Sequence, residues 1–234
     1  MLIQELEESR LFMSKLIFRY GAMNSGKSIQ VQTVAHNYEE RNMKVIIAKP
    51  GKDTKAGDKV SSRIGLERKV DLIIKENDSL LELYKNGKID FKDINCIIVD
   101  EAQFLQPSQV NELRAISEIA DIPVICYGLR TDFQTNSFPG SKRLFELADI
   151  IEEIPTICSC SKKAKFNART LNGKFVYEGE QVVIDGETDY EYTSLCPKCY
   201  LKKVLKAKLT KGNFFKRVIK DEDIAKILKL GIKE

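Results

Sequence analysis

The sequence predicts an α/β fold in which helices cover both faces of a parallel sheet, with a smaller C-terminal module after it. Three observations favour this fold. Short apolar runs alternate with helical patterns over residues 15–150. A glycine-rich segment, G-A-M-N-S-G-K-S at residues 21–28, joins the first apolar run to the first helical pattern. After about residue 155, cysteine pairs and glycines replace this rhythm, so the last part of the chain has a different architecture.

Apolar runs that are rich in β-branched residues are predicted to be buried strands. The strands are expected at 15–20, 44–50, 95–100 and 122–129, and the helices at 27–41, 78–86, 107–120 and 141–149. Continuously apolar strands that alternate with helices are typical of a parallel sheet covered on both faces. Ligands of such sheets bind at the carboxyl ends of the strands. The segment 21–28, Asp100 and the residues after Leu129 are all predicted to lie at that edge.

The segment 21–28 is a complete G-x-x-x-x-G-K-[ST] motif, with a strand before it and a helix after it. Its glycines allow the backbone N–H groups to point at phosphate oxygens, and the helix that starts there adds its positive dipole end. This predicts a P-loop NTPase-like fold that binds ATP, whereas a chance glycine-rich turn would not explain the flanks. Lys27 is expected to reach the outer phosphates and the Ser28 hydroxyl to bind Mg²⁺. The candidate ATP and Mg²⁺ ligands are Gly21, Ala22, Met23, Asn24, Ser25, Gly26, Lys27, Ser28 and Asp100.

Two adjacent acids end the strand at 95–100. A carboxylate at the position of Asp100 commonly holds magnesium in phosphate-loop enzymes, often through a water, although an ordinary acid also occurs at strand ends. Two roles stay open for Glu101 on the residues alone. It accepts the proton of a hydroxyl that receives a phosphoryl group, or it orients a water in ATP hydrolysis.

Four of the six cysteines are grouped in two pairs, C-x-C at 158–160 and C-x-x-C at 196–199. Four thiolates suit a tetrahedral structural zinc site, so Cys158, Cys160, Cys196 and Cys199 are the candidate ligands. The short spacing of the first pair leaves four unrelated thiols as the alternative. Around the glycine-rich segment between the pairs, small strands are expected at 175–177 and 181–184. Cys96 and Cys126 are expected in the core, and His36 at the surface.

Charge and hydropathy exclude several classes of function. With 38 basic and 34 acidic residues, the chain is too balanced for a typical nucleic-acid-binding protein. It has no apolar stretch near the roughly 18 residues of a membrane span, and its first residues lack a secretory core. We therefore expect a cytoplasmic protein without direct nucleic-acid or membrane contacts.

Several motifs together resemble the type II thymidine kinases, the cellular and bacterial branch of that family. The resemblance covers about residues 15–205, in the family's order. Its segments are 21–28, K-P at 49–50, V-S-S-R-I-G at 60–65, D-E-A-Q-F at 100–104, G-L-R-T-D-F at 128–133, F-P-G-S-K at 138–142 and G-E-Q-V-V-I at 179–184.

The resemblance implies transfer of the γ-phosphoryl group of ATP to the 5′-hydroxyl of thymidine, with deoxyuridine as a second acceptor. It makes Glu101 the general base on that hydroxyl, and Lys27 and Arg63 the residues that neutralise the phosphoryl group. Arg63 matches an arginine on a flexible loop; a mobile surface arginine is the alternative. The implied small-molecule and metal partners are ATP, Mg²⁺ and structural zinc.

The resemblance also implies a nucleoside pocket that a "lasso" loop at 179–192 closes through backbone contacts. The implied substrate residues are Met23, Gln103, Phe104, Leu129, Phe133, Val182, Val183, Ile184, Gly186 and Tyr192. Core packing would explain the two phenylalanines equally well. The chain departs from the family in its C-x-C pair, usually C-x-x-C, so Cys160 is expected to keep the family position more closely than Cys158. The stretch from Ile184 to Cys196 is about two residues longer than usual.

These inferences divide the chain into four parts: an N-terminal extension at 1–14, an ATP-binding domain at 15–150, a zinc and lasso domain at 151–205 and a basic tail at 206–234. A homotetramer and feedback by dTTP are further implications of the resemblance. The main alternative is a P-loop ATPase whose zinc module acts on nucleic acid. A second is a protein that binds nucleotide, or carries metal, without catalysis.

Overall fold

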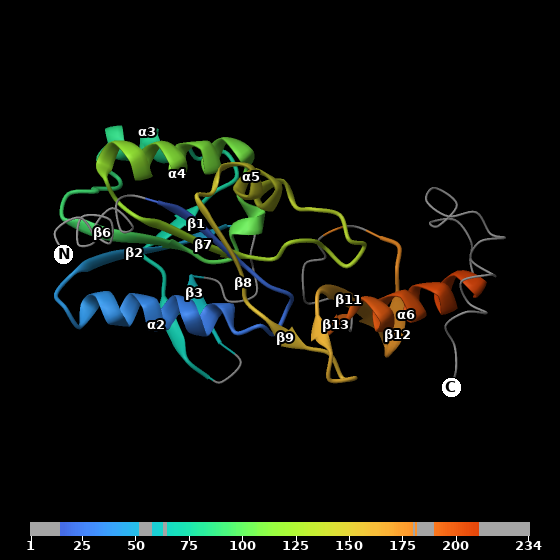
Figure 1. Cartoon of the computed structure of the whole chain (residues 1–234). Helices are drawn as coiled ribbons and strands as arrows, with labels where there is room; N and C mark the ends of the chain where they lie inside the picture. Colours follow the sequence, from blue (N-terminus) through green and yellow to red (C-terminus); the bar gives the residue numbers. More distant parts are fainter. Residues whose placement is uncertain (1–14, 52–57, 63–64, 180, 182–189, 211–234) are drawn as a thin grey trace, which may run out of the picture.

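A six-stranded parallel sheet forms the larger part of the molecule (Figure 1). The computed structural model describes residues 15–51, 58–62, 65–179, 181 and 190–210. The strand order is β5-β2-β6-β7-β1-β8. The bounds are Leu16–Tyr20 (β1), Lys44–Pro50 (β2), Leu72–Ile74 (β5), Ile94–Val99 (β6), Val124–Gly128 (β7) and Ile150–Glu153 (β8). The predicted α/β fold with a parallel sheet is confirmed.

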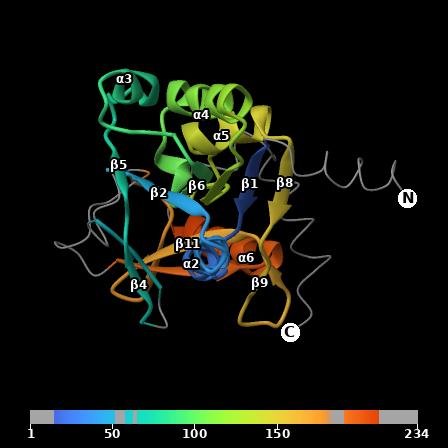
Figure 2. The ribbon, with the colours of Figure 1, turned by 90° about the vertical axis from the view of Figure 1, so that its left-hand side faces the viewer.

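Helices cover both faces of this sheet, as Figure 1 and Figure 2 show. One face carries α2 (Lys27–Glu39), and the other carries α3 (Leu80–Lys85), α4 (Pro107–Ala120) and α5 (Pro139–Leu147). Successive residues of a strand point to opposite faces, so in β6 Ile98 joins the core under α2 and Val99 joins the core under α4 and α5. Within the described part of the chain, no helix has both the length and the apolar character that crossing a bilayer requires.

The helices begin where their sequences allow. Ser79 accepts a hydrogen bond from the N–H of Glu82 at the start of α3. Pro107 and Pro139 occupy the first turns of α4 and α5, where the missing N–H costs no helical hydrogen bond. These starts agree with the predicted helices at 78–86, 107–120 and 141–149 to within a few residues.

Four strands of the larger part were not predicted. Strands β5 and β8 extend the sheet at its two edges, and a hairpin pairs β3 (Lys59–Ser61) with β4 (Glu67–Lys69). Each is three or four residues long, and β4 and β8 carry charged side chains, so neither apolar length nor clear alternation marks them. The predicted boundary at residue 150 falls inside β8, which pairs with β1.

The smaller part is built on a three-stranded antiparallel sheet with the order β12-β11-β13. Its strands are Phe166–Leu171 (β11), Lys174–Val176 (β12) and Tyr190–Leu195 (β13). A short ladder of β9 (Thr156–Ile157) and β10 (Lys163–Ala164) precedes it, and α6 (Pro197–Thr210) packs against it. The predicted small strand at 175–177 corresponds to β12, whereas Gln181 lies in a bend and 182–184 lie outside the described residues.

Candidate active site

The phosphate-binding motif forms the loop between β1 and α2, at the carboxyl edge of the sheet. Asn24 and Gly26 have positive φ angles of 63° and 82°, and Gly26 is the residue before the first turn of α2. Gly21 leaves no room for a side chain, because a Cβ there would lie 2.8 Å from the carbonyl oxygen of Ile154. The loop therefore has the tight, left-handed turns that a phosphate cradle needs.

Lys27 is buried within this loop. Its Nζ donates hydrogen bonds to the carbonyl of Ala22 at 3.1 Å and to Ser25 Oγ at 3.4 Å. Burial lowers the pKa of Lys27, and the nearby carboxylates of Glu101 and Asp100 oppose that shift. The ammonium group is thus held by weak acceptors at a place where a phosphate would be a stronger partner.

Ser28 and Asp100 meet across the loop. Ser28 Oγ donates to Asp100 Oδ2 at 3.2 Å, although the two residues come from α2 and from the end of β6. Burial, and then the neighbouring charge of Glu101, raise the pKa of Asp100 to about 7. A hydroxyl and a buried carboxylate are the oxygen ligands that Mg²⁺ prefers, and a cation would relieve the cost of ionising Asp100. The residues present therefore fit a magnesium ion.

Glu101 lies beside this pair in a left-handed backbone conformation, with a φ of 51°. Gln103 Nε2 donates to Glu101 Oε2 at 2.5 Å, and Gln103 Oε1 accepts from the N–H of Leu129 at 3.0 Å. A Cβ at Gly128 would lie 2.9 Å from Gln103 Oε1. Gln103 thus links the segments after β6 and β7 and fixes one oxygen of Glu101. Sequence reasoning gave Gln103 only as a substrate residue.

The structure describes some of the other predicted pocket residues but not all of them. Leu129 and Phe133 are buried, and Phe104 is partly exposed and packs edge-on against Phe138, with ring centroids 5.6 Å apart. Tyr192 is partly exposed in β13. Five predicted site residues lie outside the described part of the chain: Arg63, Val182, Val183, Ile184 and Gly186.

Sequence reasoning missed Arg169, which packs against Phe133, one of the predicted pocket residues. Its guanidinium lies 3.6 Å from the ring centroid of Phe133 and 4.8 Å from that of Tyr190, and it donates to the carbonyl of Glu178. Arg169 is 1% exposed. Arg169 connects Glu178 and Tyr190, at the two ends of the predicted lasso loop, to Phe133. The sequence holds no signal for this role beyond an arginine within a short strand.

The four paired cysteines come together in the smaller part. Their Sγ atoms all lie within 4.8 Å of one another, and those of Cys160 and Cys196 are 3.5 Å apart. Tetrahedral zinc with Zn–S bonds of about 2.3 Å holds its sulfur atoms roughly 3.8 Å apart, so the cluster fits zinc. Backbone N–H groups of Cys160 and Cys196 lower the pKa of Cys158 to about 6, which favours the thiolate.

The short C-x-C spacing does not remove Cys158 from the cluster. Ser161 has a φ of 64° and donates its N–H to the carbonyl of Cys158, while the N–H of Cys158 donates to Lys162. This tight turn brings both thiols of the pair inward. Both cysteines of the pair belong to the cluster, with Cys158 buried and Cys160 exposed, and the prediction that Cys160 is the more secure ligand stays a prediction.

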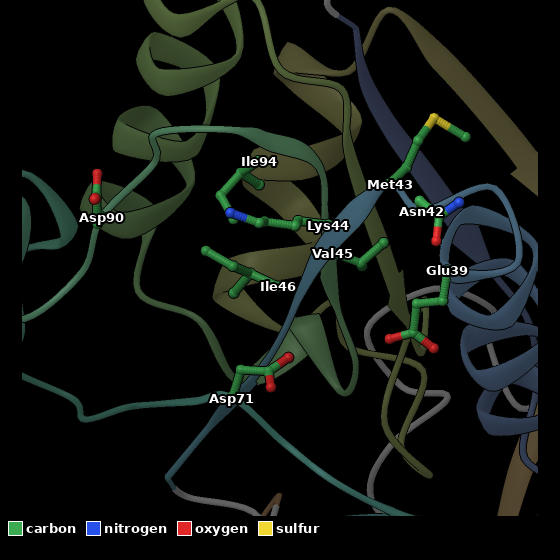
Figure 3. A pocket seen from close by; sticks show the side chains of 9 residues that line it. All are labelled: Glu39, Asn42, Met43, Lys44, Val45, Ile46, Asp71, Asp90 and Ile94. Atoms are coloured by element: carbon green, nitrogen blue, oxygen red, sulfur yellow. The ribbon is translucent and has the colours of Figure 1, made fainter.

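A hollow of about 560 Å³ lies at the opposite edge of the sheet, near the amino ends of β2 and β6 (Figure 3). Its charged side chains already have partners in the protein. Glu39 binds Arg68, Lys44 pairs with Asp93, and Asp71 accepts from the N–H of Ile47. Nothing in this hollow points to a ligand, and it is separate from the phosphate loop.

The fold and this site define a class of protein, a phosphate-loop nucleotide-binding enzyme with acidic residues at the end of a neighbouring strand and a four-cysteine module. A family model described as thymidine kinase matches residues 14–200, and the chain belongs to that family. The chain is 45% identical to a thymidine kinase of Enterobacteria phage T4, over 80% of this chain and 95% of that one. It is 47% identical to a thymidine kinase of Lactiplantibacillus plantarum, over 76% and 92%.

One solved structure shows a distant likeness to this chain. The genome packaging NTPase B204 from Sulfolobus turreted icosahedral virus 2, in complex with ATP-gammaS, is 17% identical and covers 63% of this chain and 78% of that one. Its TM-score is 0.40, so it carries no argument about the site.

Proposed function

We propose that this chain transfers the γ-phosphoryl group of ATP to the 5′-hydroxyl of thymidine, and to that of deoxyuridine. The observation that carries the proposal is the position of Glu101, which Gln103 holds at the carboxyl edge of the sheet next to the phosphate loop. A carboxylate fixed there is suited to accept a proton from a hydroxyl that attacks the γ-phosphorus. The names of the family and of the relatives support thymidine as the acceptor.

Phosphoryl transfer needs position and charge neutralisation more than covalent chemistry. In the proposed reaction, the loop 21–28 binds the triphosphate, and Lys27 exchanges the carbonyl of Ala22 for phosphate oxygens. Ser28 and Asp100 would hold Mg²⁺, which neutralises charge on the phosphates when it is bound. Arg63 is proposed to approach the same phosphates, on the family resemblance alone.

Glu101 then has one task. It accepts the hydrogen bond of the 5′-hydroxyl, orients that oxygen toward the γ-phosphorus and takes its proton as the new P–O bond forms and the bond to the ADP oxygen breaks. A hydrogen bond from Gln103 to one carboxylate oxygen leaves the other oxygen to face the acceptor. The base of the nucleoside is proposed to lie against Met23, Phe104, Leu129, Phe133 and Tyr192, beneath the lasso loop that includes Val182, Val183, Ile184 and Gly186.

Zinc, assembly and regulation are further parts of the proposal. The cluster of four cysteines is proposed to hold a structural zinc that joins the turn between β9 and β10 to the segment after β13, on either side of the lasso. A homotetramer, inhibition by dTTP and a cytoplasmic location are expected from the family resemblance.

The experiment that tests the function measures ADP release from Mg·ATP, with and without thymidine, deoxyuridine, other nucleosides and single-stranded DNA. We expect release that depends on thymidine and matches the dTMP formed. Release that single-stranded DNA stimulates and thymidine does not affect would support the alternative, a nucleic-acid ATPase in which Glu101 orients a water.

A further inference from the structure

The phosphate loop is held by side chains of the smaller part of the molecule. The N–H of Met23 donates to Asn167 Oδ1 at 2.8 Å, and Ser194 Oγ donates to the carbonyl of Met23. Asn167 and Ser194 are directly opposite each other on β11 and β13. The side chains of Asn167 and Ser194 are both buried, whereas Met23 is partly exposed, so the two hydrogen bonds are shielded from water in part.

A third side chain of the smaller part reaches the next peptide of the loop. Thr156 Oγ1 donates to the carbonyl of Asn24 at 3.2 Å. Asn167 is also bound on its other side, because its Nδ2 donates to the carbonyl of Thr131 at 3.0 Å. One side chain thus joins β11, the phosphate loop and the segment after β7 that leads to Phe133.

The direction of these hydrogen bonds decides what the loop presents to a ligand. In a planar trans peptide, the C=O and the N–H point in opposite directions. Once Ser194 holds the carbonyl of Met23, the N–H of Asn24 must point away from Ser194. In the same way, because Thr156 holds the carbonyl of Asn24, the N–H of Ser25 in the same peptide must point away from Thr156. Phosphate oxygens need N–H donors and are repelled by carbonyl oxygens, so the orientation of these two peptides affects affinity directly.

We propose that Asn167, Ser194 and Thr156 are positioning residues, which set the peptides of Met23 and Asn24 so that the phosphate loop is preformed for the triphosphate of ATP. They act through the backbone of the loop and not on the reacting atoms. The inference rests on the proposed function only in that ATP is the ligand of the loop. The smaller part of the molecule, which is already proposed to close over the nucleoside, would thus also shape the phosphate site.

An asparagine is well suited to this position. Its amide oxygen accepts from Met23 while its amide nitrogen donates to Thr131, and no shorter polar side chain offers both groups in one plane. Ser194 needs only a donor, and threonine would supply the same hydroxyl. Substitutions that keep or remove these hydrogen-bonding groups therefore distinguish a positioning role from plain packing.

The test measures the affinity of the zinc-loaded full chain for Mg·AMP-PNP, a non-hydrolysable ATP analogue, by calorimetry in the absence of nucleoside. We expect Ser194→Ala and Asn167→Ala each to weaken binding about tenfold, and Thr156→Ala about threefold, because a preformed loop loses its anchors. Ser194→Thr should bind as the unmodified protein does. Thr193→Ala, at an exposed neighbouring position of β13, is the matched control and should stay within about twofold.

Affinities within about twofold of the unmodified protein in the alanine variants that fold would overturn the proposal, even if their melting temperatures fall. Only folded molecules bind the analogue, so a partly unfolded sample lowers the fitted stoichiometry and leaves the affinity measurable. Thr156 is partly exposed, so its alanine variant is expected to fold and give a result. Because no nucleoside is present, the outcome does not depend on which acceptor the enzyme uses. A failure of the thymidine assay therefore leaves this test intact.

Discussion

Gln103 holds Glu101 in place: its Nε2 donates to Glu101 Oε2 at 2.5 Å, while its Oε1 accepts from the backbone of Leu129. The buried amide therefore fixes a carboxylate against a neighbouring strand end, although Glu101 itself lies in a strained left-handed backbone conformation. A fixed acid next to a phosphate loop is the central relationship of the proposed site, and the first two predictions follow from it.

Replacement of Glu101 tests the general base. Glu101→Gln keeps the shape of the side chain but removes the proton acceptor, so turnover should fall by about 10²–10⁴. The affinity for Mg·ATP should change by less than about threefold, because Lys27 and Ser28 remain. Steady-state kinetics and calorimetry measure the two quantities. Turnover within about threefold of the unmodified enzyme would remove Glu101 from the mechanism.

Replacement of Gln103 tests the support of that base. Gln103→Ala frees Glu101 and leaves the N–H of Leu129 without its partner, so kcat should fall about 10- to 100-fold and stability by about 1–3 kcal/mol. Gln109→Ala is the control, since Gln109 is an equally buried glutamine that binds the carbonyls of Lys75 and Asp78 far from the site. It should lose stability and keep kcat. Equal kcat in the two variants would mean that Gln103 has a structural role only.

The raised pKa of Asp100 predicts a pH dependence. Magnesium is proposed to bind the ionised carboxylate of Asp100, whose pKa burial raises to about 7, so affinity for Mg²⁺ should fall about tenfold per pH unit below pH 7. The stability of the metal-free protein changes with pH in the opposite direction to the affinity for Mg²⁺. In the metal-free protein Asp100 keeps its proton up to about pH 7, whereas in the unfolded chain it ionises near pH 4, so this group lowers stability as pH rises between those values.

Two measurements check this prediction. Denaturant unfolding without magnesium should show a decrease of stability from pH 4 to 7 that Asp100→Asn diminishes. Magnesium titrations from pH 5.5 to 8.5 should show the loss of affinity on the acidic side. An affinity for Mg²⁺ that is constant from pH 6 to 8 would contradict the raised pKa.

The four-cysteine cluster predicts which thiols hold zinc. Cys196→Ser and Cys158→Ser should each lower the zinc content and the melting temperature, because a site with three thiolates is weaker. Cys126→Ala removes a thiol that is equally buried but lies in β7, outside the cluster, and should keep its zinc. Elemental analysis after gel filtration measures the metal. Full zinc in Cys158→Ser would show that the C-x-C pair supplies a single ligand.

Much of the larger part could be predicted because its signals are local. Continuous apolar runs predicted β1, β2, β6 and β7 with little error, and the motif 21–28 predicted the loop that follows β1. The adjacent acids at 100 and 101 follow directly from the end of a buried strand. Short edge strands such as β5 and β8 were missed because three or four residues do not establish a hydrophobic period.

The supports of the site could not be predicted, since they connect residues far apart in the chain. Asn167 meets Met23 across 144 positions, and Ser194 meets it across 171. Arg169 is a charged residue whose burial depends on two aromatic rings and a carbonyl from other segments. In a single sequence, polar residues like these are indistinguishable from those of an exposed strand. Their roles appear only when the fold brings β11 and β13 against the phosphate loop.

The most direct test of the central claim follows the γ-phosphoryl group itself. The full-length protein is incubated with ATP labelled at the γ-phosphorus, Mg²⁺ and thymidine, and the products are separated. The label should appear in thymidine 5′-monophosphate in an amount equal to the ADP formed, and Glu101→Gln should slow this transfer by about 10²–10⁴. Label that accumulates in inorganic phosphate, at a rate that thymidine does not change, would contradict the claim.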